Sequence, residues 1–105
     1  MTFGQIISAN RKKHGLSQKD LAQLVVKEDG SPISPQYLND IERDRRNAPP
    51  EYLIGRLAAV LQLDPDYLYY LAGQIPEDLR AGGHSQEKVQ EAFVAFRRAL
   101  DNRQV

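Results

Sequence analysis

Apolar residues recur at spacings of three and four along most of this 105-residue chain, and no segment alternates apolar and polar residues with period two. The first spacing places side chains on one face of an α-helix, whereas the second is typical of a strand. Because only the helical spacing is present, the sequence predicts an all-α protein without a β-sheet. A chain of this length is expected to form one small domain with a short appendage.

Capping residues and prolines divide the chain into helical segments. Four of the expected helices follow a serine or aspartate, whose side-chain oxygen can accept a hydrogen bond from a free backbone N–H of the first turn. These residues are Ser17, Ser34, Asp64 and Ser85. Gly15 and Gly73 are expected to end helices, because glycine readily adopts the left-handed conformation found there. The adjacent prolines at 49 and 50 separate two further helices, since neither can lie inside one.

These boundaries predict three regions. Residues 1–73 are expected to form one domain of five helices, and residues 74–84 a glycine-rich linker that contains at most one helical turn. Residues 85–105 are expected to supply a C-terminal amphipathic helix that reaches about Asn102 and is a candidate dimerisation element.

Several functional classes lack the residues that they require. The chain has no cysteine, and its two histidines, His14 and His84, have no carboxylate at metal-ligand spacing. It has no glycine-rich phosphate loop and no nucleophile motif. We therefore expect no enzyme activity, no metal and no cofactor, and the sequence does not identify a small-molecule effector. The chain also lacks an 18-residue apolar run and a secretory signal, so we expect a cytoplasmic protein without a membrane partner.

The net charge is zero, because fourteen lysines and arginines balance fourteen acidic residues. Binding to nucleic acid would therefore depend on local basic clusters. Two such clusters are residues 11–13 and the arginines at positions 43, 45 and 46.

The stretch from Ser34 to Asn47 gathers amides and arginines around one short helix. Leu38 and Ile41 have the spacing expected of its buried face, and the outward set comprises Gln36, Asn39, Asp40 and Arg43. Such a face is often only solvated. Amides, however, suit adenine edges in a major groove, and the neighbouring arginines could neutralise phosphates. The preceding helix begins at 17–19, and its free N–H groups attract phosphate.

Two sequence blocks, "GLSQKDLA" and "YLNDIERDRRN", occur in an order and spacing that resembles the helix-turn-helix domain of the XRE family, the phage-repressor and Cro type. The resemblance covers about residues 3–72. It implies a lambda repressor-like fold of five helices, in which the second and third form the DNA-reading unit and the third lies in the major groove. It also implies a sequence-specific transcriptional regulator, most simply a repressor, with double-stranded DNA as its partner.

The resemblance assigns individual roles to residues of this unit. Gln18 would bond a backbone phosphate, Gln36 and Asp40 would point at base edges, and Tyr37 and Asn39 would stand at the flanks. The arginines that follow would hold the phosphate backbone. The full set of expected DNA-binding residues is Ser17, Gln18, Lys19, Ser34, Gln36, Tyr37, Asn39, Asp40, Arg43, Arg45, Arg46 and Asn47.

Three other residues are expected to be structural. In the resembled family, an arginine and a glutamate at the positions of Arg11 and Glu42 pair across the domain. Ala22 matches the small residue that lets the two helices of the motif approach closely.

The chain departs from the family's pattern at three places. Loop 27–33 makes the connection between the two helices about six residues longer than usual, a change that costs little free energy. It should bulge outward, where it could touch DNA, a partner or neither. Asp40 places an acid at a base-facing position, where it could select cytosine or leave the base contacts to Gln36 and Tyr37. Asp44 stands where the family usually has glycine and must tolerate a left-handed conformation.

Five apolar residues of the C-terminal helix fall within about 100° of arc, which makes a single stripe. They are Val89, Ala92, Phe93, Phe96 and Leu100. We expect this stripe to form a homodimer that reads an inverted repeat, because two phenylalanines left in water would be adhesive. The alternative is that the helix folds back onto its own domain. The alternative function is an antitoxin-like or accessory protein that grips a partner with this helix.

Overall fold

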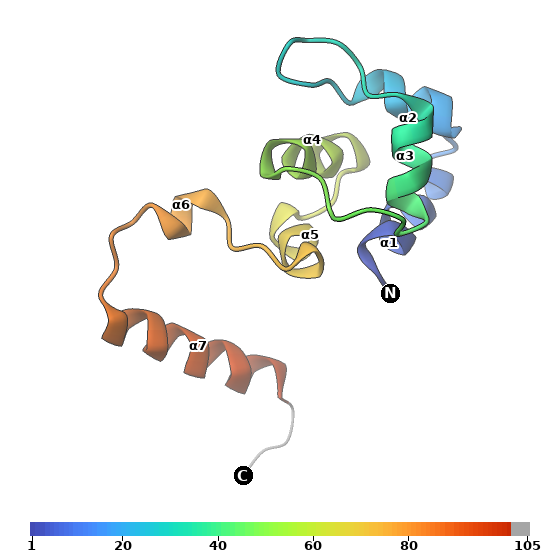
Figure 1. The fold of residues 1–105 in the computed structure, drawn as a ribbon. Coiled ribbons are helices and arrows are strands. Elements are labelled where there is room, and N and C mark those ends of the chain that lie inside the picture. Colours follow the sequence, from blue (N-terminus) through green and yellow to red (C-terminus); the bar gives the residue numbers. More distant parts are fainter. Residues whose placement is uncertain (102–105) are drawn as a thin grey trace.

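Seven α-helices supply the regular structure of residues 1–101, the part of the chain that the computed structural model describes (Figure 1). They are α1 (Phe3–Lys13), α2 (Gln18–Leu24), α3 (Pro35–Glu42), α4 (Glu51–Leu61), α5 (Pro65–Ala72), α6 (Glu77–Arg80) and α7 (Gln86–Leu100). The extended pairing within residues 1–101 is one isolated antiparallel bridge between Val26 and Pro32. The all-α prediction is therefore confirmed.

Local capping determines where most helices begin. At α2, the Ser17 hydroxyl accepts from the backbone N–H of Asp20 at 3.0 Å, and the Asp20 carboxylate accepts from the N–H of Ser17 at 3.1 Å. Ser34, Asp64 and Ser85 cap α3, α5 and α7 in the expected way. The capping box formed by Thr2 and Gln5 at the start of α1 was not predicted.

The expected end of the C-terminal helix was placed too late. Helix α7 ends at Leu100, because Asp101 adopts an extended conformation. Asn102 lies outside the described residues.

One apolar core lies among the first five helices. Helix α1 packs against α3, α4 and α5, while α2 packs against α3, and α4 against α5. The buried apolar residues are Phe3, Ile7, Leu21, Ala22, Val25, Ile33, Leu38, Ile41, Leu53, Ile54, Leu57, Ala58, Leu61 and Leu68. This packing holds α2 and α3 in a fixed relation and leaves the outer side of α3 in solvent.

The start of α1 meets the end of α3 at very close range. A Cβ atom on Gly4 would lie 2.4 Å from the carbonyl oxygen of Ile41 and 2.6 Å from that of Glu42, so only glycine fits there. Asp44 follows α3 with a φ of 55°, as its position in the turn requires. Its carboxylate accepts hydrogen bonds from the N–H of Gly4 and from the Thr2 hydroxyl. An acid at a helix N-terminus is favourable, which offsets part of the cost of the left-handed conformation.

Helices α6 and α7 lie apart from this core (Figure 1). Every residue of α7 is exposed, and its ring contact with the domain joins Tyr70 and Phe96, whose centroids are 6.1 Å apart. Helix α6 is tethered through Glu51, which accepts from the backbone N–H of Glu77 and from the guanidinium of Arg80, both at 3.0 Å. The radius of gyration of 15.9 Å exceeds the ~13 Å of a compact chain of this length because α7 projects outward. No helix among residues 1–101 is long and apolar enough to cross a membrane.

Candidate nucleic-acid interface

Helices α2 and α3 form a helix-turn-helix pair that is joined by polar as well as apolar contacts. Ala22 is buried, as its expected role requires. The side-chain amide of Gln18 donates to Oδ1 of Asn39 at 3.1 Å and to Oε1 of Glu42 at 3.0 Å. Asn39 Oδ1 also accepts from Nε of Arg43 at 3.3 Å. The amide nitrogen of Gln18 therefore connects the two helices, a role that sequence reasoning missed.

The expected pair between Arg11 and Glu42 is present and ties α1 to α3. The guanidinium donates to both carboxylate oxygens, from Nε at 2.7 Å and from Nη2 at 2.9 Å, and Nη1 donates to the carbonyl of Leu16 at 2.9 Å. Both residues are buried. Burial by itself raises the pKa of Glu42, but hydrogen bonds from Arg11 and Gln18 and the charge of Arg11 outweigh it, so the net pKa is lowered. The hydrogen bond to Glu42 raises the pKa of Arg11.

The outer side of α3 carries Gln36 and Asp40, which contact each other. The Gln36 amide donates to Oδ1 of Asp40 at 3.1 Å. Arg45 Nη1 lies 4.0 Å from Oδ1 of Asp40, and Arg46 Nε lies 3.7 Å from Oδ2. The guanidinium of Arg46 also lies 5.1 Å from the ring centroid of Tyr37. The acidic charge at this position is thus balanced by two arginines that extend back from the turn after α3.

The remaining expected DNA-binding residues occupy the edges of this surface. Ser17 and Ser34 use their hydroxyls as helix caps. Lys19, Arg43 and Asn47 have exposed side chains. Tyr37 is half-buried at the side of α3 that faces α4, and burial raises the pKa of its phenol, which stays protonated at neutral pH.

The longer loop between α2 and α3 is an ordered hairpin, which we call the inserted hairpin (residues 26–33). It bulges outward as expected (Figure 1). The backbone N–H of Lys27 donates to the carbonyl of Ser31 at 2.7 Å, and Asp29 accepts from both the N–H and the hydroxyl of Ser31. Arg56 of α4 donates to the carbonyls of Val26 and Lys27, the latter at 2.9 Å. The sequence did not reveal this anchor, because Arg56 lies on the polar face of α4 and its position gives no sign of a partner in a distant loop.

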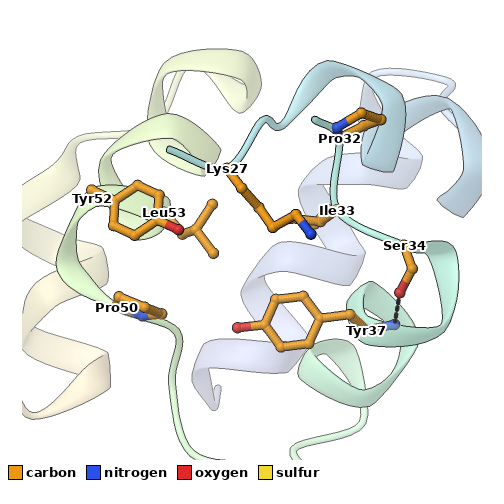
Figure 2. Close-up of a pocket in the computed structure, with 8 residues that line it drawn as sticks. All are labelled: Lys27, Pro32, Ile33, Ser34, Tyr37, Pro50, Tyr52 and Leu53. Atoms are coloured by element: carbon orange, nitrogen blue, oxygen red, sulfur yellow. Dashed lines mark hydrogen bonds between the residues drawn. The ribbon is translucent and has the colours of Figure 1, made fainter. Parts of the chain in front are cut away.

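A shallow groove of about 390 Å³, open to solvent, separates the inserted hairpin and α3 from the start of α4 (Figure 2). Its apolar lining consists of Pro32, Ile33, Pro50 and Leu53, and its polar lining of Lys27, Ser34, Tyr37 and Tyr52. Figure 2 shows the side chain of Lys27 extending across the groove toward Ile33 and Tyr37.

Comparisons with known proteins agree with this geometry. A family model described as helix-turn-helix matches residues 7–68, more than half of the chain. The solved structure of SinR, the master regulator for biofilm formation, in complex with DNA is 28% identical, with 64% of this chain and 97% of that chain covered and a TM-score of 0.55. The structure of the SinR–SinI complex is 20% identical, with 97% and 100% covered and a TM-score of 0.54, and is informative about the fold alone. No match was found among curated proteins.

Proposed function

The chain belongs to the helix-turn-helix family of the XRE, or lambda repressor-like, type and is a DNA-binding transcriptional regulator, and from this premise we propose that it recognises a specific operator through α3 and represses transcription there. Members of this family are DNA-binding regulators rather than enzymes. The 28% identity to SinR, solved in complex with DNA, supports the same mode of binding here.

The observation that carries the proposal is the arrangement of side chains on α3. Gln36 is exposed and held by Asp40, whose charge is balanced by Arg45 and Arg46. An amide presented in this way can make a bidentate contact to adenine in the major groove. The three arginines at 43, 45 and 46 lie next to it and are suited to phosphates. Gln36 is therefore proposed as the principal base-reading residue, with Asp40 as the residue that orients it.

The second part of the proposal is a homodimer that reads an inverted repeat. One helix-turn-helix unit covers only a half-site, and a two-fold dimer would place two α3 helices one helical turn apart, ~34 Å. The stripe on α7 supports this assembly, because Phe93 and Phe96 remain 44% and 45% exposed in the single chain. Apolar side chains of this size on one exposed stripe favour association.

The same stripe favours a second candidate function, an accessory protein that grips another protein through α7. Salt distinguishes the two functions. Specific DNA binding should weaken steeply as salt rises, because phosphate contacts release counterions. A contact made through the apolar stripe should respond little to salt.

The test of the proposed function is selection of bound DNA from a random pool, followed by titration of variants against the selected site. Gln36→Ala should weaken binding to that site by ~1–3 kcal/mol and flatten the preference at one base pair. Arg45→Ala and Arg46→Ala are the matched controls, because loss of a phosphate contact should weaken all sequences alike. Equal loss of specific and non-specific binding in Gln36→Ala would show that Gln36 only positions the protein.

A further inference from the structure

The groove beside the inserted hairpin holds three polar groups that lack a hydrogen-bond or ion-pair partner within residues 1–101. They are the ammonium of Lys27 and the phenols of Tyr37 and Tyr52. Each phenol ring carries a guanidinium against it, with Arg46 lying 5.1 Å from the centroid of Tyr37 and Arg56 lying 5.2 Å from that of Tyr52. The groove is thus an apolar surface with two hydroxyls and the ammonium of Lys27 on its lining. Of the two guanidinium groups against its rings, Arg46 is paired with Asp40 and Arg56 donates to backbone carbonyls of the inserted hairpin.

The carboxylates near the groove belong to Glu28, Asp29, Asp40 and Glu51. Asp40 is paired with Arg46, and Asp29 keeps its charge beside Lys27. The Asp29 carboxylate accepts from Ser31, and the Glu51 carboxylate accepts from Glu77 and Arg80. Glu28, at the tip of the inserted hairpin, is exposed. The charged group on the lining itself is the ammonium of Lys27, which together with the two phenols favours an anionic ligand with an apolar part.

The position of the groove relative to α3 indicates which ligand this is. At 100° per residue, Tyr37 and Asn39 lie on opposite sides of the face that carries Gln36 and Asp40. The Asn39 side faces Gln18 of α2, and the Tyr37 side faces the groove. A helix inserted in a major groove about 12 Å wide has one phosphate backbone along each side. The second backbone would therefore pass over the groove.

We propose that the groove receives the sugar–phosphate backbone of one operator strand, with Lys27 and the hydroxyls of Tyr37 and Tyr52 binding a phosphate. Pro32 and Pro50 offer apolar surface to the deoxyribose. The inserted hairpin then acts as an added arm of the DNA interface, and Arg56 is its positioning residue. This inference rests on the proposed function and extends it to a part of the chain that the helix-turn-helix pair does not include.

The experiment compares Lys27→Gln with Arg98→Gln in the full chain. Arg98 is exposed on α7, on the side away from its apolar stripe, so both variants remove one positive charge but only one removes it from the groove. Affinity for the selected operator is measured against salt, and phosphate contacts are mapped by ethylation interference. Lys27→Gln should weaken binding roughly tenfold, reduce the salt slope by about 0.9 and keep the base preference.

Lys27→Gln should also lose interference at one phosphate in each half-site, and Arg98→Gln should change neither the slope nor the map. Tyr52→Phe, which keeps the ring, should weaken binding without altering the slope. An unchanged slope and an unchanged map in a folded Lys27→Gln protein would overturn the inference, and binding of a small ligand in the groove would then be the alternative. Retention of the Gln36-dependent preference in that case would leave the proposed function standing, whereas a wild-type chain that selects no DNA would overturn both.

Discussion

At the residue scale, Asp40 is an acidic residue on the side of α3 that is proposed to face DNA, and two arginines lie close to it. An acid that faces DNA would repel phosphate, but this carboxylate lies within 4.0 Å of both Arg45 and Arg46 and accepts from Gln36. Asp40 is half-buried and its two arginines are exposed, and ion pairs with an exposed partner at this separation add little stability. These contacts have two other effects. The carboxylate partly balances the charge of the two arginines, and it holds the Gln36 side chain in one orientation before DNA binds.

The ion pair between Arg11 and Glu42 affects the stability of the fold because both charged groups are buried. Each charge has left water, and each is compensated by bidentate geometry and by further bonds to Leu16 and Gln18. Removal of one partner would leave an uncompensated charge in the interior.

Arg11→Ala is therefore expected to cost ~3 kcal/mol or more in the free energy of unfolding, measured by thermal or urea denaturation. Lys12→Ala is the matched control, because Lys12 is exposed on the same helix and its replacement should change stability by less than ~0.5 kcal/mol.

The pH dependence of the same pair follows from Glu42, whose pKa is lowered on folding. The unfolded chain then binds more protons in the acidic range, so this stabilisation is full above about pH 5 and is lost as the pH falls through the folded pKa.

Glu42→Gln should flatten the fall in stability below about pH 5, since the amide does not titrate. An Arg11→Ala protein as stable as the wild type, or a Glu42→Gln protein with the wild-type acid profile, would contradict this account of the pair.

At the element scale, the inserted hairpin shows how a long connection can be ordered from outside itself. Its local bonds are few: the Lys27–Ser31 and Ile33–Val25 backbone bonds that form the Val26–Pro32 bridge, the turn at Gly30, and the bonds from Ser31 to Asp29. An isolated hairpin of this size is marginal in water. The guanidinium of Arg56, on α4, supplies charged hydrogen bonds to two of its carbonyls. Arg56 of α4 therefore fixes the hairpin together with the burial of Ile33 in the core.

Arg56→Gln is expected to raise the hydrogen-exchange rates of the Lys27 and Gly30 amides roughly ten- to hundredfold, the equivalent of ~1.5–3 kcal/mol for charged hydrogen bonds. Arg80→Gln is a suitable control, because Arg80 contacts Glu51 and Glu77 instead of the hairpin. Equal protection of both amides in the Arg56→Gln and wild-type chains would mean that the hairpin is ordered without its anchor.

At the scale of the whole molecule, the chain combines a packed five-helix unit with a helix that stands apart from it. The tether through Glu51 and Arg80 holds α6 against the start of α4, and α7 then extends beyond it (Figure 1). Every residue of α7 is exposed, so folding of the single chain leaves much of the apolar stripe in solvent, with Phe96 in ring contact with Tyr70. This arrangement is consistent with the homodimer that we propose.

Phe93→Asp combined with Phe96→Asp should give a folded monomer that binds the operator far more weakly, as measured by sedimentation and DNA titration. Val94→Asp combined with Ala95→Asp is the matched control, because these residues lie away from the stripe on the same helix and add the same charge. The control should remain dimeric. Sedimentation of the wild-type chain as a monomer at tens of micromolar would end the dimer proposal.

The class of fold and most helix starts follow from local sequence. Capping by Ser17, Ser34, Asp64 and Ser85 acts within one turn of the chain, so the signal and its result are neighbours in sequence. The helix-turn-helix pair followed from a resemblance carried by two blocks, and the family match now supports it. The end of α7 was placed less well, because no glycine or proline marks it.

Contacts between residues far apart in sequence depend on how the helices pack. Gly4 lies against the carbonyl of Ile41, Asp44 binds the start of α1, and Arg56 holds the inserted hairpin about thirty positions earlier in the chain. No periodicity or short motif encodes such pairs, because their distances depend on how α1, α3 and α4 pack around the core. The groove beside Tyr37 arises in the same way, since its walls come from three segments that only folding brings together.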